Sequence, residues 1–365
     1  MRQPRPAAPV RASVPTPAIG ALLAGALLAV VPGPSGAAPV GDAIDRTAIA
    51  VRSPQSAVLL AAALAGERVV AVGERGLVVL SDDGGASWRQ APAPVSVTLT
   101  GVRFADARRG WAIGHGAVVL ATDDGGEHWV RRLDGRTAAQ RALEDAKAGG
   151  DERALKDAER LVTDGPDKPL LDLVVFDAQR LLVVGAYGLA LYSDDAGASW
   201  TSWATRLPNP KGLHLYAARR HGERLLLAGE QGLALQSADG GQHFRRLETP
   251  YKGTFFSAEV LEDGTLLLAG LRGNMLRSRD DGVTWTPVAS PMPVSITATA
   301  VTPGGGILAV NQAGFVLEVR DDRLLPLNPT PLPPLNGLLP RAGAPLLAMS
   351  VLGVLALPAT PGGAK

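Results

Sequence analysis

Short runs of apolar residues recur along the chain, separated by polar turns that contain glycine and aspartate. The most regular polar stretch is an octet of the form S/T-x-D-x-G-x-x-W/F, found at 81–88, 122–129, 193–200, 237–244 and 278–285. An apolar run that ends in a glycine-bearing turn, as in VVAVGERG, precedes each octet. Short apolar runs bounded by such turns predict β-strands.

The spacing of the octets indicates a repeated unit. Their final aromatic residues fall at positions 88, 129, 200, 244 and 285, so the successive intervals are 41, 71, 44 and 41 residues. A period of roughly 40 residues with four short strands is typical of a β-propeller blade. Two weaker copies of the turn, at 307–314 and 346–353, lack the octet and raise the count to seven.

We therefore predict an all-β fold, a seven-bladed β-propeller of four-stranded blades that spans residues 44–358. Closing the ring removes strand edges that an open sheet would have to protect. We expect the segment 46–52 to supply a strand that completes the last blade and closes the ring.

The longest interval contains an insertion at 136–164. This segment is rich in alanine and in oppositely charged residues four positions apart, and Gly149 and Gly150 interrupt it. The pattern predicts a helical hairpin between blades 2 and 3. Its apolar face would consist of Leu143, Leu155, Leu161 and Val162. Two roles stay open, namely packing on the propeller, or docking a partner helix or covering the channel.

Each octet is predicted to be part of the frame. Asp83 can accept backbone N–H bonds across its turn, Gly85 can supply a positive φ, and Trp88 can pack between sheets. Copies around a ring point in different directions and cannot converge on one substrate. Each offers too few carboxylates for a calcium loop, so we expect no metal and no cofactor. The predicted structural residues are Asp83, Gly85, Trp88, Asp124, Gly126, Trp129, Asp195, Gly197, Trp200, Asp239, Gly241, Phe244, Asp280, Gly282 and Trp285.

The N-terminus is typical of an export signal. Three arginines precede an uncharged apolar run at 18–31, and small residues suited to cleavage follow. We predict a signal peptide over 1–38 and a periplasmic location; an uncleaved membrane anchor is the alternative. Removing 1–38 changes the formal net charge from +1 to −2, which leaves no basic surface for nucleic acid. We expect a monomer.

The octet is the Asp-box, or BNR repeat, of several propeller families. The combination of the octet, the upstream glycine turn and Gly110–Trp111 resembles the photosystem II stability/assembly factor family, over roughly residues 55–320. The resemblance implies an exported propeller that helps to assemble a membrane protein complex, with a photosynthetic subunit as partner. The Ala/Arg/Leu/Gly-rich chain looks like a bacterial product, and relatives of that kind resemble accessory proteins of RND-type exporters, which implies a transporter as partner.

The residues needed for an enzymatic role are largely missing from the sequence. Sialidases share the Asp-box but need an arginine triad and a tyrosine nucleophile with a carboxylate partner. Their F/Y-R-I-P segment is absent, and the five histidines form no metal motif. Glu74 and Glu230, on equivalent turns, are predicted to be solvated charges rather than a glycosidase pair. We expect no enzymatic activity; the alternative is a carbohydrate-binding or sialidase-type glycoside hydrolase propeller.

Propellers usually bind at a face around the central opening. We expect the turns between second and third strands to converge there and to form either a protein-binding surface or simply solvated tips. The candidate protein-binding residues are Glu74, Arg75, His115, Tyr187, Glu230, Gln231, Arg272, Asn274 and Gln312.

Overall fold

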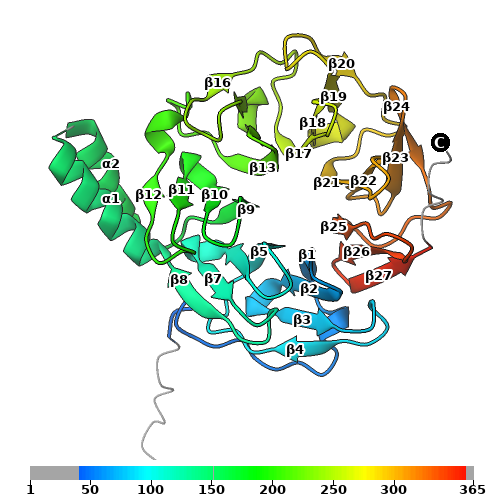
Figure 1. The fold of residues 1–365 in the computed structure, drawn as a ribbon, viewed down its shortest axis with the longest axis horizontal. Coiled ribbons are helices and arrows are strands. Elements are labelled where there is room, and N and C mark those ends of the chain that lie inside the picture. Colours follow the sequence, from blue (N-terminus) through cyan, green and yellow to red (C-terminus); the bar gives the residue numbers. More distant parts are fainter. Residues whose placement is uncertain (1–40, 151, 359–365) are drawn as a thin grey trace, which may run out of the picture. The chain divides into compact units, whose positions relative to one another are not determined.

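Seven antiparallel sheets form a ring around a central axis (Figure 1), and their inner strands line a central channel. The computed structural model describes residues 41–150 and 152–358, so the predicted signal peptide lies outside the described residues. The predicted all-β propeller with seven blades is confirmed. Within the described residues, no helix is long and apolar enough to cross a membrane.

Each blade is a meander whose first strand lines the channel. Blade 1 contains β1 (Leu59–Ala65), β2 (Arg68–Gly73), β3 (Val78–Ser81) and β4 (Arg89–Ala91). Blade 2 contains β5 (Leu99–Phe104), β6 (Gly110–Gly114), β7 (Val119–Thr122) and β8 (Val130–Leu133). Blade 3 contains β9 (Leu170–Val175), β10 (Leu181–Gly185), β11 (Ala190–Ser193) and β12 (Thr201–Ser202). Blade 4 contains β13 (Leu215–His221), β14 (Arg224–Gly229), β15 (Ala234–Ser237) and β16 (Arg245–Arg246).

The remaining blades follow in chain order. Blade 5 contains β17 (Phe255–Val260), β18 (Leu266–Gly270), β19 (Met275–Ser278) and β20 (Thr286–Pro287). Blade 6 contains β21 (Ile296–Val301), β22 (Ile307–Asn311), β23 (Val316–Arg320) and β24 (Arg323–Pro326). Blade 7 contains β25 (Leu335–Leu339), β26 (Leu346–Ser350) and β27 (Gly353–Leu357). The short 3-10 helices are η1 (Pro54–Ser56), η2 (Glu74–Gly76), η3 (His115–Ala117), η4 (Ala186–Gly188), η5 (Ala204–Arg206), η6 (Glu230–Gly232) and η7 (Leu271–Gly273).

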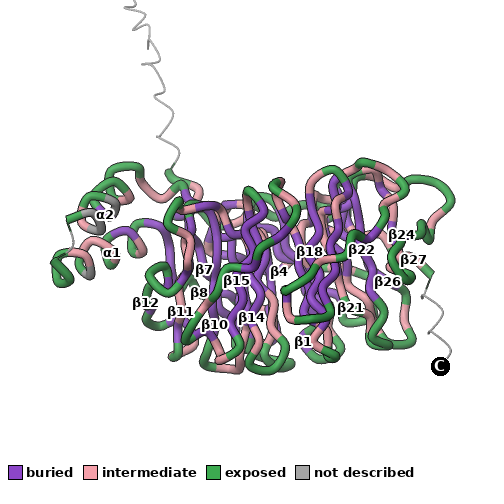
Figure 2. The backbone as a smooth tube through the Cα atoms, turned by 90° about the horizontal axis from the view of Figure 1, so that it is seen from above, coloured by how far each residue is buried: buried purple, intermediate pink, exposed green. Residues whose placement is uncertain are grey.

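The core lies between blades rather than at the centre of the ring. Seven apolar clusters occupy the seven interfaces between neighbouring blades, including the interface of blade 7 with blade 1. The second and third strands, such as β2 and β3, are buried on both faces, which explains their continuous apolar runs. Figure 2 shows these buried strands through the thickness of the ring, with exposed loops above and below.

The prediction that 46–52 completes the last blade is wrong. Within the described residues, blade 7 has only three strands. The segment lies instead along blade 1, where the Ala48 N–H donates to the Ala93 carbonyl at 3.0 Å. The Gln90 side chain bonds to the carbonyl of Ile49 and to the N–H of Val51, at 3.0 and 2.9 Å. A side chain of β4 thus satisfies the extended backbone of this segment.

Side chains of blade 7 close the ring. Asn336 on β25 donates to the Leu59 carbonyl on β1 at 2.9 Å. Arg341 donates to the Gly84 carbonyl, in the first octet, at 3.0 Å. Trp88 of the same octet packs with Leu347 of β26 in the cluster between blades 7 and 1. Closure therefore rests on side-chain contacts and packing, with no shared sheet.

The octets form turns between third and fourth strands. The Asp83 carboxylate accepts from the Ser87 N–H at 2.9 Å and from the Ser81 hydroxyl at 2.8 Å, and the Ser81 oxygen accepts from the Gly85 N–H at 2.7 Å. Gly85 has φ +95°, a conformation that L side chains rarely adopt. The Trp88 indole donates to the Gly85 carbonyl at 3.0 Å, which fixes the ring on its own turn.

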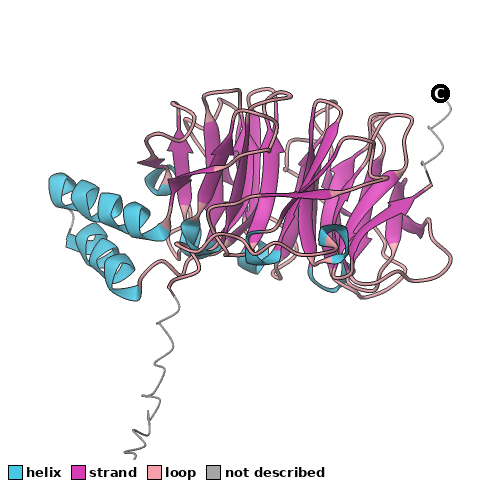
Figure 3. Ribbon diagram, turned by 90° about the horizontal axis from the view of Figure 1, so that it is seen from below, coloured by secondary structure: helices cyan, strands magenta, loops and turns pink. Residues whose placement is uncertain are grey.

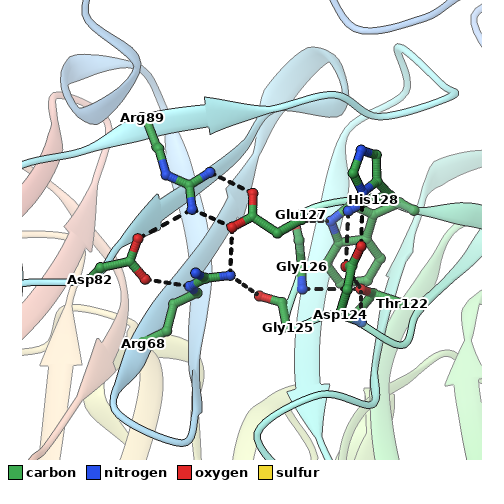
Figure 4. Close-up of polar contacts among 10 residues, drawn as sticks. Arg68, Asp82, Arg89, Thr122, Asp124, Gly125, Gly126, Glu127 and His128 are labelled. Carbon is green, nitrogen blue, oxygen red and sulfur yellow. Dashed lines mark hydrogen bonds and ion pairs between the residues drawn. The ribbon is translucent and has the colours of Figure 1, made fainter.

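Each of the five octets is also bonded to the blade before it. Between blades 1 and 2, Arg68 of β2 donates to the Gly125 carbonyl at 3.2 Å and pairs with Glu127 at 2.9 Å (Figure 4). Arg89 of β4 pairs with Glu127 at 2.5 Å and with Asp82 at 3.2 Å. The turn of one blade is thereby held to two strands of its neighbour.

The predicted helical insertion lies between β8 and β9. It consists of α1 (Gly135–Gly149) and α2 (Glu152–Asp164), which pack against each other beside blades 2 and 3 (Figure 1). Asp134 caps α1 by accepting from the Thr137 N–H at 3.0 Å, and Gly150 ends it with φ +69°. Among the described side chains of the two helices, the buried residues are the small Gly135, Ala139 and Ala158. Of the predicted apolar face, Leu143, Leu155 and Leu161 are half-buried and Val162 is exposed.

Replacing an octet aromatic should destabilise the ring strongly. Trp129 is 6% exposed between blades 1 and 2, so Trp129→Ala should lower the free energy of unfolding by about 3–5 kcal/mol. The adjacent Val130 is 57% exposed, and Val130→Ala should change the free energy of unfolding by less than about 0.5 kcal/mol. Urea unfolding of both variants measures the difference; equal effects would refute the assigned role.

The octet carboxylates should set the acid limit of stability. Hydrogen bonds from the side chain and backbone of Ser87 lower the pKa of Asp83 from 3.8 to about 2. Hydrogen bonds from the side chain and backbone of Thr284 lower the pKa of Asp280 to about 2 as well. Because the folded-state pKa is depressed, this stabilisation is present above about pH 4 and is lost as the pH falls toward 2. Asp83→Asn, which cannot titrate, should flatten the fall in urea-unfolding free energy over this range. An unchanged pH profile would contradict this origin.

Candidate functional site

The channel mouth is built by a β-bulge repeated in every blade. Near the start of each innermost strand the register shifts by one residue, and the extra residue has no partner on the second strand. These seven residues line a cavity of about 130 Å³ in the channel. A bulge re-aims a side chain, here toward the axis of the ring. The bulged residues are Leu60, Thr100, Leu171, Tyr216, Phe256, Thr297 and Asn336.

The polar bulge residues connect neighbouring blades. Thr100 donates to the Leu170 carbonyl, and Thr297 to the Leu335 carbonyl, both at 2.7 Å. Asn336 makes the closing bond to Leu59 described above. The bulge residues of blades 4 and 5 are aromatic instead, so this side of the mouth presents rings.

These rings belong to an aromatic row, defined here as Tyr187, His214, Tyr216 and Phe256. Tyr216 and Phe256 meet edge to face at 5.3 Å between ring centroids, and His214 lies 6.1 Å from Tyr216. Tyr187, on the η4 turn of blade 3, contacts His214 at 4.8 Å. The row thus runs from a turn of blade 3, across blade 4, to the channel mouth at blade 5. Tyr187 is 61% exposed, so the outer end of the row is open to a ligand.

Charged groups hold the row in place. Glu230 accepts from the His214 backbone N–H at 2.9 Å and lies 3.3 Å from its ring Nδ1. The Lys168 ammonium lies 5.0 Å from the centroid of the Tyr187 ring, and Lys168 is only 9% exposed. Burial opposes the charge of Lys168, but hydrogen bonds to Asp167 and Asp164 raise its pKa. Lys168, held by two carboxylates, therefore stabilises the exposed ring of Tyr187 through a cation–π contact.

Deeper in the channel, ion pairs join the inner strands of four blades. Arg219 on β13 binds Asp172 on β9 and lies 3.5 Å from Glu259 on β17. Arg103 on β5 lies 3.5 Å from Asp172. Burial raises the pKa of Glu259 and lowers that of Arg103. Burial would also lower the pKa of Arg219, but Asp172 and Glu259 raise it.

The nine predicted binding residues all lie on or next to the turns between second and third strands. These turns form the face called the turn face below, where most of the short 3-10 helices lie (Figure 3). Seven of the nine are exposed, and Glu230 and Asn274 are partly buried. Arg75, Tyr187, Gln231 and Arg272 have φ between 53° and 58°, so the turns project them outward. Across different turns, the described structure links Tyr187 and Glu230 through His214. Arg272 and Asn274 line one hollow of their own turn.

Bulge residues, rather than turn tips, line the channel mouth. Sequence reasoning therefore missed Lys168, His214, Tyr216 and Phe256 as site residues. An alignment of the seven inner strands on their second position would have shown the two adjacent aromatics. Within the described part of the chain, no group of three or more His, Asp or Glu is arranged to hold a metal ion.

Comparisons with known proteins show the fold. The chain matches no family model, and no curated protein matches it in sequence. Among solved structures it is similar to YCF48 bound to D1 peptide, with a TM-score of 0.61 at 15% identity, covering 86% of this chain and 99% of that one. YCF48 from Cyanidioschyzon merolae gives 0.60 at 15% identity, over 83% and 96% of the two chains.

A third similar structure is an enzyme. The GH74 xyloglucanase from Xanthomonas campestris gives a TM-score of 0.54 at 17% identity, over 80% of this chain and 51% of that one. A peptide-binding protein and a xyloglucanase are thus similar in fold to this chain, and fold alone does not decide between their functions. The chain is a β-propeller similar in fold to YCF48.

Breaking the channel ion pairs should destabilise the protein in a pH-dependent way. Arg219→Gln leaves Asp172 and Glu259 without their shared cation, which should cost about 3 kcal/mol at pH 8. Since the folded-state pKa of Glu259 is raised, the loss should be smaller near pH 4.5, where this carboxyl binds a proton. Urea unfolding at both pH values tests this, with the exposed Arg279→Gln as control. An equal loss at both pH values would contradict the pairing.

Proposed function

We propose that this propeller is a non-enzymatic scaffold that binds a segment of a membrane protein on its turn face. The aromatic row is the observation that carries the proposal. Tyrosines and other aromatics held rigidly at a surface are the usual anchors of protein interfaces, because they bury a large area at a small entropic cost. Contacts to Lys168 and His214 already order the Tyr187 ring before any ligand binds.

The geometry suits an extended peptide. The row crosses three blades from an exposed turn to the channel, so a bound chain can follow it and direct side chains toward the mouth. Glu230 and Lys168 lie beside the row and offer polar partners at its edge. YCF48, which is similar in fold over nearly its whole length, binds a D1 peptide, and this supports peptide binding by the present chain.

The family resemblance and the N-terminus support a specific form of this proposed role. A signal peptide over 1–38 would carry the protein to the periplasm, where it would assist the assembly of a membrane complex. A photosystem II assembly factor-like role is one form of this proposal. An accessory role for an RND-type transporter is the other, and it takes a transporter subunit as the partner.

The channel carboxylates support a role without catalysis. A glycoside hydrolase needs one carboxyl to protonate the leaving group and a second to act as nucleophile or base. Asp172 and Glu259 are instead joined through Arg219, and Glu259 also accepts from the Thr299 hydroxyl at 2.8 Å. Their contacts explain them as a structural bridge between blades.

Polysaccharide binding is the second candidate. Aromatic rings exposed along a groove can stack on sugars, and the xyloglucanase shares the architecture. In that case Tyr187 would bind a glucan chain rather than a peptide. Binding assays with each of these two ligands therefore distinguish the scaffold from the polysaccharide-binding protein.

Tyr187→Ala should abolish partner binding without unfolding the protein. Affinity purification from native membranes after mild crosslinking should enrich an integral membrane protein with the wild-type chain and lose it, by about tenfold or more, with the variant. Val283→Ala, at an exposed apolar residue of the blade 5 octet away from the turn face, is the matched control and should retain the partner.

Two results would redirect the proposal. Equal capture by the wild-type chain and the Tyr187 variant would exclude the aromatic row as the binding site. Binding of xyloglucan oligosaccharides that is lost in Tyr187→Ala, with no membrane protein captured, would favour the polysaccharide candidate.

A further inference from the structure

The outer strands of six blades are protected against pairing with another chain. β12, β16 and β20 have two residues each, and β4 has three. β8 and β24 are longer but carry Arg131, Arg132 and Arg323. Short length and charge are the devices by which proteins keep a free strand edge from acting as a template.

The outer strand of blade 7 lacks these devices. β27 has five residues, Gly-Val-Leu-Ala-Leu, with neither charge nor proline. Among the described residues, only β26 pairs with it. Val354, Leu355 and Leu357 are partly exposed, and Ala356 is exposed. Blade 7 therefore ends in an apolar edge, roughly 17 Å long at about 3.4 Å per residue.

The backbone of β27 can accept a further strand. Ser350 and Gly353 form the hydrogen-bonded pair that closes a two-residue hairpin between β26 and β27. Along an antiparallel pair of strands, hydrogen-bonded and non-hydrogen-bonded residue pairs alternate. Counting from this closing pair, the N–H and C=O groups of Val354 and Ala356 point away from β26. A strand added at this edge would bond to these two residues.

The other blades indicate what an added strand would contact. An apolar residue in or just after the fourth strand packs beside the octet aromatic of the next blade. Leu133 lies in one cluster with Trp200, and Leu247 lies in one with Trp285. Trp203 meets Phe244 at 6.4 Å. In the ring, blade 1 comes next after blade 7, and its octet aromatic is Trp88. Trp88 lies in one cluster with Val354 of β27 and stays partly exposed.

We propose that β27 receives an extended apolar segment of a partner polypeptide, which adds to blade 7 as its fourth strand. Main-chain hydrogen bonds to Val354 and Ala356 would hold the segment, and one of its aliphatic side chains would pack on Trp88. This is strand addition at a sheet edge, and it uses a surface separate from the aromatic row.

The edge fits a linear segment of a partner better than the C-terminal residues or a second copy of the chain. Residues 359–365 contain Pro361, Gly362 and Gly363 and no aliphatic residue larger than alanine, so they cannot supply the side chain for Trp88. Two copies meeting through one short strand on their convex rims would bury far less than the roughly 1,200 Å² of a stable interface. A peptide needs only the edge itself.

The full-length chain can be tested with a defined probe. The probe is a short capped peptide of alternating threonine and valine with one central leucine. The control peptide has proline in place of alternate threonines and so lacks the necessary N–H groups. Saturating probe should slow amide exchange of Val354 and Ala356 by about tenfold or more and change the fluorescence of Trp88. The proline peptide should do neither.

Two variants at one exposed position separate pairing from folding. Ala356→Pro removes an outward N–H but leaves the bonds to β26, so probe affinity should fall about tenfold or more. Ala356→Thr keeps the N–H and favours a strand, so it should bind at least as well as the wild-type chain. If Ala356→Pro melts early, Ala356→Lys adds a protecting charge at the same place and should show the same loss.

Three outcomes would overturn the proposal. Slow exchange of Val354 and Ala356 in the free monomer would mean that the chain's own residues cover the edge. A dimer seen by analytical ultracentrifugation and lost in Ala356→Pro would identify a second copy as the occupant. Probe binding unchanged in Ala356→Pro and Ala356→Lys would place the peptide elsewhere.

Discussion

Apolar packing between neighbouring blades is the interaction on which the rest of this structure depends. No single blade has a core of its own, and each of the seven apolar clusters draws its residues from two sheets. The octet strengthens this packing because its aromatic residue lies on the preceding blade while its aspartate and glycine fix the turn. A ring built in this way is stable only when it is closed, since an open ring would expose two of these faces to water.

The closed ring is also what creates the candidate site. Seven equivalent bulges direct seven side chains toward one axis, and the identity of each side chain decides its use. Threonine and asparagine connect the blades, whereas Tyr216 and Phe256 remain available as rings. The same repeated backbone thus serves as frame on one side of the mouth and as a binding surface on the other.

Much of the fold was predictable because local chemistry is repeated. Each glycine turn and each octet folds through contacts within a few residues, as the bonds among Ser81, Asp83 and Gly85 illustrate. The helical insertion was predictable for the same reason, since the cap by Asp134 and the end at Gly150 are local. The fate of 46–52 was not, because an extended apolar segment fits more than one edge, and the Gln90 side chain favours blade 1.

The sequence by itself therefore determined the number of blades, the place of the insertion and the structural character of the octets. Only the tertiary structure decided which side chains meet. His214 and Tyr216 lie far along the chain from Lys168 and Phe256, and the packing of blade 4 between blades 3 and 5 brings them into one chain of contacts with Tyr187. It likewise decided that β27 ends blade 7 without a charged or shortened edge. Repeats specify a blade through local contacts, whereas sites arise between blades, where residues distant in sequence come together.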